Sequence, residues 1–182
     1  MNCIDQESVL IERAKSGDRS AFAALLETQY SRIFRCAYKW LGNREDAEDV
    51  AQDVSVKLAK KIADFRGDSA LSSWIYRVTL NAVRDFERQR AGRNLGLGKY
   101  FQFMQVVGEE QVQSDDAELD DLWFSVRKLP PKQRDAVLLV YGEECTHQTA
   151  AGIMNCSEKT VSWHLHAARK KLRHILKEEG HV

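Results

Sequence analysis

The sequence predicts an all-α fold of two small helical domains, a four-helix N-terminal bundle and a C-terminal helix-turn-helix domain, joined by a flexible linker. Apolar residues recur at i, i+3, i+4 and i+7 along most of the chain, which is the spacing of amphipathic helices. Only two prolines occur in the 182 residues, and they are adjacent at Pro130 and Pro131. Few strand-like alternating runs are present, so little competes with helix formation.

Four helices are expected in the N-terminal part, over residues 7–16, 20–40 and 44–63 and within the segment 65–90, which has helical spacing from Ser72 onward. Leu41-Gly42-Asn43 is typical of a helix end, because glycine accepts the left-handed conformation that closes many helices. The third helix carries the most regular apolar stripe. Its members are Ala47, Val50, Ala51, Val54 and Leu58.

The fourth helix divides into two faces. The apolar face consists of Ile75, Val78, Thr79, Ala82 and Phe86. The opposite face carries Arg77, Asn81, Arg84 and Arg88 at i, i+4, i+7 and i+11, with Trp74 at the border. Three guanidinium groups and an amide are suited to a nucleic-acid strand, although an ordinary solvated basic face has the same pattern.

The composition changes after residue 91. Glycines at 92, 96 and 98 are followed by Tyr100, Phe101 and Phe103, and then by an acidic run. We therefore divide the chain into a domain at 1–91, a linker at 92–117 and a second domain at 118–182. The aromatic residues favour a linker that docks on a partner, while its composition equally fits a disordered tether.

Helices are expected in the second domain over 119–128, 131–141, 146–154 and 157–179, with Pro131 in the first turn of its helix. The last two helices, with a tight turn at Asn155-Cys156, form a helix-turn-helix pattern. The buried stripe of the second is Val161, Leu165, Ala168 and Leu172. A plain helical hairpin has the same pattern, so the motif alone leaves DNA binding open.

Several classes of protein are disfavoured by the composition. The formal net charge is zero, but the basic residues lie on either side of the acidic segment. No signal peptide or membrane-spanning run is present, and four separated cysteines without a CxxC pair indicate reduced thiols in a cytoplasmic protein. No nucleotide-binding loop, nucleophile elbow or catalytic triad is found, so we expect neither an enzyme nor a cofactor.

Nearly the whole chain resembles one family, the bacterial extracytoplasmic-function (ECF) sigma factors of the sigma-70 family. The resemblance rests on the order and spacing of several motifs. These are GDRSAFAALLETQYSRIF, LGNREDAEDVAQDV, FRGDSALSSWIYRVTLNAVRDFER, LPPKQRDAVLL and the SEKTV step into the last helix. It implies a dissociable transcription initiation subunit that directs RNA polymerase to promoters.

The resemblance implies partners and the residues that meet them. The helix with AEDVAQDV would bind the β′ clamp of core RNA polymerase, through Asp46, Asp49, Gln52 and Asp53. The C-terminal domain would contact the β flap. Members of this family are commonly held inactive by an anti-sigma factor, so we expect such a partner as well as promoter DNA.

The two promoter elements would be read by different domains. By resemblance, the melted −10 element would contact Phe65, Arg77, Asn81, Arg84 and Arg88. The −35 element would contact the last helix through Lys159, Thr160, Ser162, Trp163, His166, Arg169 and Lys170. Here the chain departs from the family, which often has arginines near the places of Ser162, His164 and Ala167. Base preference at this element should therefore differ.

Two other functions compete with the sigma factor. A helix-turn-helix regulator that binds DNA without polymerase would leave the aspartates of the third helix unexplained. A metal-dependent switch could use Cys145, His147, Cys156 and His164. Their spacing matches no common zinc pattern, which disfavours this class.

Overall fold

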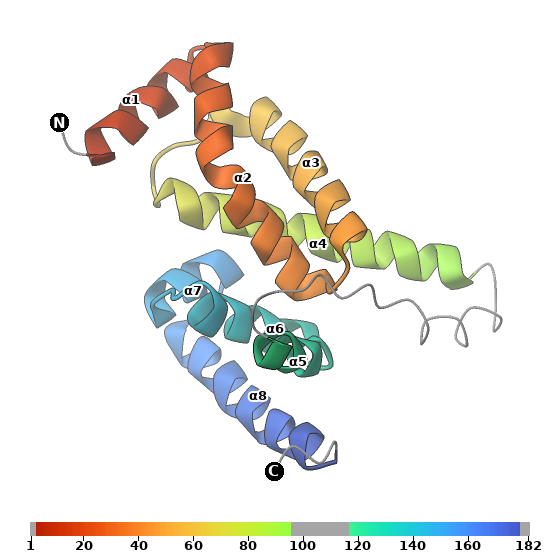
Figure 1. Cartoon of the computed structure of the whole chain (residues 1–182). Coiled ribbons are helices and arrows are strands. Elements are labelled where there is room, and N and C mark those ends of the chain that lie inside the picture. The colour runs from red at the N-terminus through yellow and green to blue at the C-terminus, as the bar shows by residue number, and fades with distance from the viewer. Residues whose placement is uncertain (1–2, 96–116, 179–182) are drawn as a thin grey trace.

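The computed structural model describes residues 3–95 and 117–178, which are helical almost throughout and contain no strand. The predicted all-α class is confirmed. The N-terminal unit consists of α1 (Cys3–Lys15), α2 (Arg19–Leu41), α3 (Arg44–Lys61), the 3-10 turn η1 (Ile62–Asp64) and α4 (Leu71–Leu95). The C-terminal unit consists of α5 (Ala117–Arg127), α6 (Pro131–Val137), η3 (Leu138–Gly142), α7 (His147–Met154) and α8 (Glu158–Glu178) (Figure 1).

The linker predicted at 92–117 lies largely outside the described residues. Its two ends are nevertheless helical, because α4 continues to Leu95 and α5 begins at Ala117. Helix-favouring Ala91, Arg93 and Leu95 sustain the last turn of α4 despite the glycine among them. The aromatic patch at 100–103 is not among the described residues.

Local signals set the ends of the first helices. The Asp18 carboxylate accepts hydrogen bonds from the Ser20 and Ala21 amides and begins α2. A hydrogen bond from the Ser20 hydroxyl, together with those from the Ala21 amide and Arg13, holds the pKa of Asp18 far below its usual range. Gly42 ends α2 at φ 73° in the left-handed region, and the Asn43 side chain then caps α3. A Cβ at residue 42 would lie 2.5 Å from Nε of Arg127, so a larger residue there would also displace the Arg127 side chain.

The buried residues confirm most of the predicted stripes. In α3, all five predicted residues are buried, and in α8 Val161, Leu165 and Ala168 are buried. Helix α4 buries more residues than the single apolar stripe predicted for it. Besides Ile75, Thr79 and Ala82, it buries a second stripe of Tyr76, Leu80 and Val83. A helix buried on two sides has neighbours on both, and α4 contacts α2 and α3 as well as α7.

The C-terminal unit begins its second helix as the prolines predict, with Pro130 at the N-cap and Pro131 in the first turn of α6. The expected α-helix to Tyr141 is shorter, because the chain widens into a π-helical turn over η3. Asn155 adopts the left-handed conformation (φ 52°) and makes the turn between α7 and α8, as predicted.

The cap of α7 offers a direct test of this local structure. The Thr146 hydroxyl accepts from the Thr149 amide at 3.1 Å. We expect Thr146→Ala to lower the free energy of unfolding by about 1 kcal/mol, because one amide in the first turn loses its partner. Urea unfolding followed by circular dichroism measures this loss. Thr146→Ser keeps the hydroxyl and should retain nearly all of the stability, and an equal loss in both variants would contradict the role of the cap.

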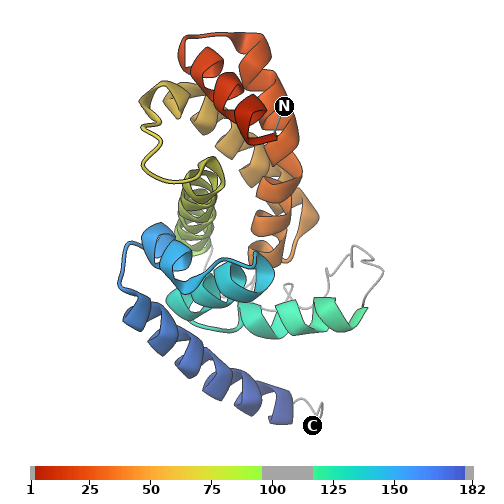
Figure 2. The same ribbon diagram turned by 90° about the vertical axis from the view of Figure 1, so that its left-hand side faces the viewer.

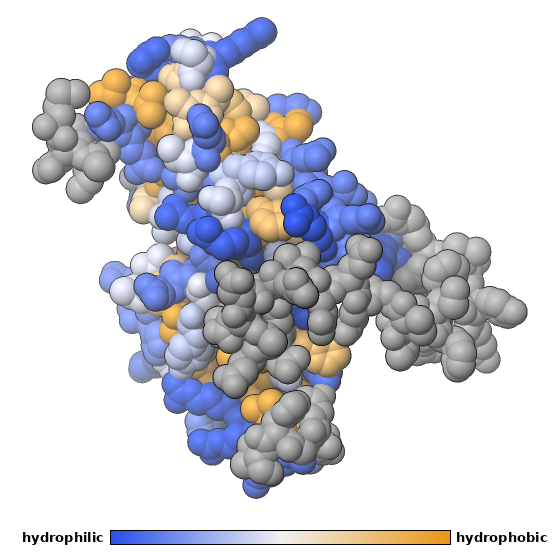
Figure 3. Space-filling view, in the orientation of Figure 1, coloured by the Kyte–Doolittle hydropathy of each residue, from blue (hydrophilic) through white to orange (hydrophobic). Residues whose placement is uncertain are grey.

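The two units lie against each other. Figures 1 and 2 show the C-terminal unit below the ends of α2 and α4, with α7 beside α4. Contacts join α4 to α7, α2 to α5, and α2 to η3. On the face drawn in Figure 3, the coloured surface is mostly hydrophilic, and hydrophobic residues gather at the end that carries α1 and the start of α2.

Candidate nucleic-acid and protein interfaces

The acidic face of α3 borders an open hollow. Asp49, Gln52 and Asp53 are exposed, whereas Asp46 is half-buried and accepts a hydrogen bond from Arg90 at 2.6 Å. Asp53 pairs with Lys57 on its own helix at 2.6 Å. The hollow, of about 300 Å³, lies between α3 and α4. Its lining is Asp49, Val50, Asp53, Lys57, Ala82, Asp85, Phe86 and Gln89.

This hollow has an apolar floor and a mainly acidic rim. Asp85 and Gln89 of α4 complete the rim opposite the aspartates of α3. Neither residue was predicted from the sequence, although Asp85 lies three residues from Arg88, with which it pairs. Carboxylates around a shallow apolar floor are suited to a basic side chain of a protein partner.

The polar face of α4 is divided between solvent and the C-terminal unit. Asn81 and Arg88 are exposed, and Asn81 Oδ1 accepts from Arg84 at 3.3 Å. Arg77 Nη2 donates to the Gly152 carbonyl of α7 at 3.0 Å. Arg84 forms an ion pair with Asp135 of α6. The face is therefore basic, but two of its three arginines bind the chain's own C-terminal unit.

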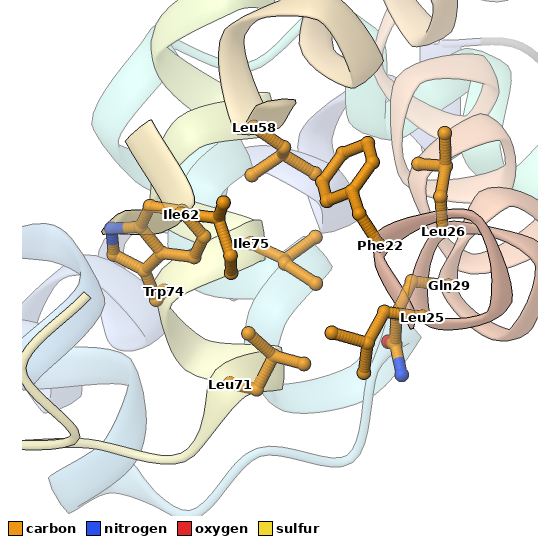
Figure 4. Close-up of a pocket in the computed structure, with 9 residues that line it drawn as sticks. All are labelled: Phe22, Leu25, Leu26, Gln29, Leu58, Ile62, Leu71, Trp74 and Ile75. Atoms are coloured by element: carbon orange, nitrogen blue, oxygen red, sulfur yellow. The ribbon is translucent and has the colours of Figure 1, made fainter. Parts of the chain in front are cut away.

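Phe65 lies at the end of η1 and is buried, with its ring centroid 5.2 Å from that of Trp74. Trp74 also lines an apolar pocket between α2, α3, η1 and α4 (Figure 4). The other lining residues are Phe22, Leu25, Leu26, Gln29, Leu58, Ile62, Leu71 and Ile75. Only Gln29 and the indole supply polar atoms there. The contact between the Phe65 and Trp74 rings thus anchors the exposed loop at 66–68 to the core. It also positions this loop next to α4, the helix that carries Asn81.

The polar face of α8 is accessible. Lys159, Ser162, His166 and Lys170 are exposed, and Trp163 has 62% of its surface exposed. Thr160 is half-buried, and its amide donates to the Ser157 hydroxyl that caps the helix. Arg169 is exposed and donates to the Tyr141 hydroxyl. The seven residues predicted from the sequence therefore share the outward side of the helix-turn-helix.

A set of charged residues that was not predicted from the sequence lies between the two units. Glu143 accepts hydrogen bonds from Lys39 Nζ at 2.9 Å and from the Tyr76 hydroxyl at 2.6 Å. Arg134 pairs with Glu87 at 3.1 Å and stacks 4.1 Å above the ring of Trp40. Asp135 is completely buried, and burial raises its pKa although Arg84 opposes the rise. These charged residues could have been recognised from the sequence, because Arg134 and Asp135 directly precede the apolar run Ala136–Leu139, which is buried in the structure.

The four residues of the metal-switch alternative are not grouped as a ligand set among the described residues. Within residues 3–95 and 117–178, no three side chains of His, Cys, Asp or Glu are grouped so that they could hold a metal ion. The described cysteines are unpaired as well: Cys36, Cys145 and Cys156 are free thiols. Burial raises the pKa of Cys36 and of Cys145, which disfavours the reactive thiolate at both.

Two family models match the chain, and their boundaries follow the two units. Sigma-70 region 2 matches residues 25–93, and Sigma-70, region 4 matches residues 119–172. The chain belongs to the sigma-70 family. It is an ECF sigma factor, a transcription initiation factor that directs core RNA polymerase to promoters and is not itself an enzyme.

Relatives of this sigma factor match over almost their whole length. It is 29% identical to the ECF RNA polymerase sigma factor SigW of Bacillus subtilis over 180 residues, which cover 92% of this chain and 95% of SigW. It is 26% identical to the RNA polymerase sigma-H factor of Pseudomonas aeruginosa, with 96% and 97% of the two chains covered.

Solved structures show the same fold. The structure of CnrH in complex with the cytosolic domain of CnrY matches with a TM-score of 0.71 and 24% identity, over 95% of this chain and 98% of that one. A co-crystal structure of the sigma factor RpoE with the anti-sigma factor NepR from Bartonella quintana matches with a TM-score of 0.67 and 24% identity, over 86% and 96%. None of the helices described for this sigma factor combines the length and apolarity needed to cross a membrane.

Proposed function

We propose that this sigma factor binds the β′ clamp of core RNA polymerase through the α3 face and the −10 element through the polar face of α4. The observation that carries the proposal is that the two faces flank one small bundle, with the acidic hollow on one side of α4 and Asn81 on another. Core polymerase bound at α3 would thus hold α4 beside the promoter DNA that the polymerase opens.

The residues have distinct roles in this proposal. Asp49, Gln52 and Asp53 meet the clamp, with Asp46 at the edge of the contact. Asn81 hydrogen-bonds an unpaired base, while Arg77, Arg84 and Arg88 hold phosphates of the single strand. Phe65 contributes by fixing the loop at 66–68, since its ring is buried against Trp74.

In the C-terminal unit, we propose that α8 docks in the major groove of the −35 element. The exposed Lys159, Arg169 and Lys170 would reach phosphates, and Ser162, Trp163 and His166 would face base edges, with Thr160 at the start of the helix. Because no arginine stands at 162, 164 or 167, the bidentate contact to guanine is missing there. The β flap is the polymerase contact that we assign to this unit.

The same proposal covers regulation and location. Two solved relatives are described in complexes, CnrH with CnrY and RpoE with the anti-sigma factor NepR. We assign an anti-sigma partner to this chain as well, with the exposed Trp163 as one of its contacts. The chain would work in the cytoplasm, with residues 1–91 and 118–182 as its functional domains.

Asn81→Ala tests the −10 assignment. We expect core polymerase binding to persist while run-off transcription falls about tenfold or more, because a base contact is worth ~1–3 kcal/mol. The measurement is run-off transcription with reconstituted holoenzyme on a promoter mapped after overexpression. Gln6→Ala removes an exposed amide from α1 and should leave transcription unchanged. Full activity of the Asn81 variant would remove this residue from the −10 contact.

A further inference from the structure

One side chain of α7 reaches the outward side of α8. Nδ1 of His147 and Oγ of Ser162 lie 3.2 Å apart, which is hydrogen-bonding distance, although 15 positions separate the two residues in the chain. Both residues are exposed. His147 is the first residue of α7, directly after the Thr146 cap, so the start of this helix fixes where the ring lies. The contact therefore adds a residue of the first helix to the surface that the second helix presents.

Ser162 has the shortest side chain of the exposed polar row of α8. Lys159 lies three positions before it, His166 lies four positions after it, and Trp163 is its neighbour, so the serine stands in the middle of that row. Its hydroxyl has one proton and two lone pairs, and a free hydroxyl rotates. It can thus donate to a base edge or accept from one. A serine without a fixed partner therefore discriminates poorly among bases.

The hydrogen bond to His147 removes this freedom. A neutral imidazole has one nitrogen that donates and one that accepts. When Nε2 carries the proton, Nδ1 is the acceptor, and the single proton of Ser162 Oγ points to it. Only the lone pairs of Oγ then remain for DNA. In the major groove, the matching donors are the amino groups at N6 of adenine and N4 of cytosine.

We propose that His147 is a positioning residue for −35 recognition, which holds the Ser162 hydroxyl as an acceptor and makes α8 prefer adenine or cytosine at one base position. The role of His147 rests on the proposed docking of α8 in the major groove, and it adds a specificity-determining residue outside α8. The hydrogen bond contributes little to folding, because both groups are exposed and water replaces either partner. Its consequence is therefore in the choice of base.

Other polar side chains of the row are held in a different way. Oγ1 of Thr160 lies 2.8 Å from Oγ of Ser157, within the first turn of the same helix. Arg169 is held by the Tyr141 hydroxyl, but a guanidinium has only donors, so this partner does not change what the arginine offers to DNA. At Ser162, by contrast, the partner decides whether the group donates or accepts.

Substitutions at residue 147 separate the hydrogen bond from the ring. His147→Phe keeps an aromatic ring but has no nitrogen to accept the serine proton. His147→Asn loses the ring but supplies Oδ1 as an acceptor in place of Nδ1. Ser162→Ala removes the hydroxyl itself. Gln148→Ala is the matched control, because Gln148 is the exposed neighbour in the first turn of α7. Circular dichroism verifies that each variant keeps its helical content.

The measurement uses reconstituted holoenzyme and a promoter library with a randomised −35 element. Sequencing of the bound DNA gives the relative affinity for each base at each position. In the wild type we expect one position at which adenine and cytosine are preferred about fivefold, which corresponds to ~1 kcal/mol for one neutral hydrogen bond. Ser162→Ala and His147→Phe should each reduce that preference to less than about twofold. His147→Asn should restore it, and Gln148→Ala should leave it unchanged.

The double variant shows whether the two residues act as one unit. His147→Phe with Ser162→Ala should lose no more preference than Ser162→Ala alone, because the imidazole acts through the hydroxyl. A preference that persists in His147→Phe, even with a uniform loss of affinity for all sequences, would overturn the positioning role. A wild-type preference for guanine or thymine at the position that Ser162→Ala changes would overturn the acceptor assignment.

Failure of the proposed −35 docking gives a different result. In that case the wild-type holoenzyme shows no base preference at any position of the randomised element, and the role of His147 is overturned together with the docking. If the wild type does show preferences and only the effect of residue 147 is missing, the docking stands and the positioning role alone is overturned.

Discussion

Reversing the charges of Asp49 and Asp53 is expected to weaken association with core RNA polymerase about a hundredfold. Both carboxylates are exposed on the rim of the hollow between α3 and α4, so arginines fit there without disturbing the core. Like charges brought together at an interface cost several kcal/mol, which corresponds to this loss. Co-purification with core enzyme and a titration by fluorescence anisotropy measure it.

The control for Asp49→Arg with Asp53→Arg applies the same charge change elsewhere. Glu7→Arg with Glu12→Arg alters two exposed carboxylates of α1, away from the hollow. Polymerase binding should be retained in that variant, and circular dichroism should show equal helical content in both. If the α3 variant still co-purifies with core enzyme like the wild type, the clamp does not bind this face.

Replacing Trp40 by alanine is expected to lower the free energy of unfolding by about 3–5 kcal/mol. The side chain is only 1% exposed at the end of α2, and Arg134 of the C-terminal unit stacks on its ring. Its removal leaves a cavity and also takes away the surface on which the guanidinium rests. The midpoint of urea unfolding measures the loss.

Trp163→Ala is the matched control for this substitution. The Trp163 ring is 62% exposed on α8, so its removal should change the free energy of unfolding by less than about 0.5 kcal/mol. The same variant should reduce promoter binding if α8 reads the −35 element. A loss of less than about 1 kcal/mol in Trp40→Ala would contradict the burial of this ring and its stacking with Arg134.

Much of the fold could be predicted from periodicity and end signals. The five-residue stripe of α3 and the turn at Asn155 were both predicted, because each depends on neighbouring residues along one helix or turn. The end of α4 and the π-helical turn of η3 were missed. In α4, the helix propensity of the surrounding residues is high enough for the helix to continue through Gly92. In η3, the apolar residues keep the spacing of an α-helix, so the sequence does not indicate the π-helical turn.

The candidate sites were predicted in part. The polar face of α4 and the aspartates of α3 could be recognised, since each lies on one helix at regular spacing. Asp85 and Gln89 could not, because they join the rim of the hollow only when α4 packs beside α3. Assigning the residues to polymerase and promoter depended on the family, since a solvated charged face has the same local pattern.

The sequence alone determined the class of the fold, the family, and which helix faces are apolar, acidic or basic. These are properties of residues close together in the chain, which spacing and motif order encode directly. Only the tertiary structure decided what the arginines of α4 touch. Asp135 lies 51 positions from Arg84, and Gly152 lies 75 from Arg77. Such pairs form because packing brings distant helix ends together, and no periodicity within either helix records the partner.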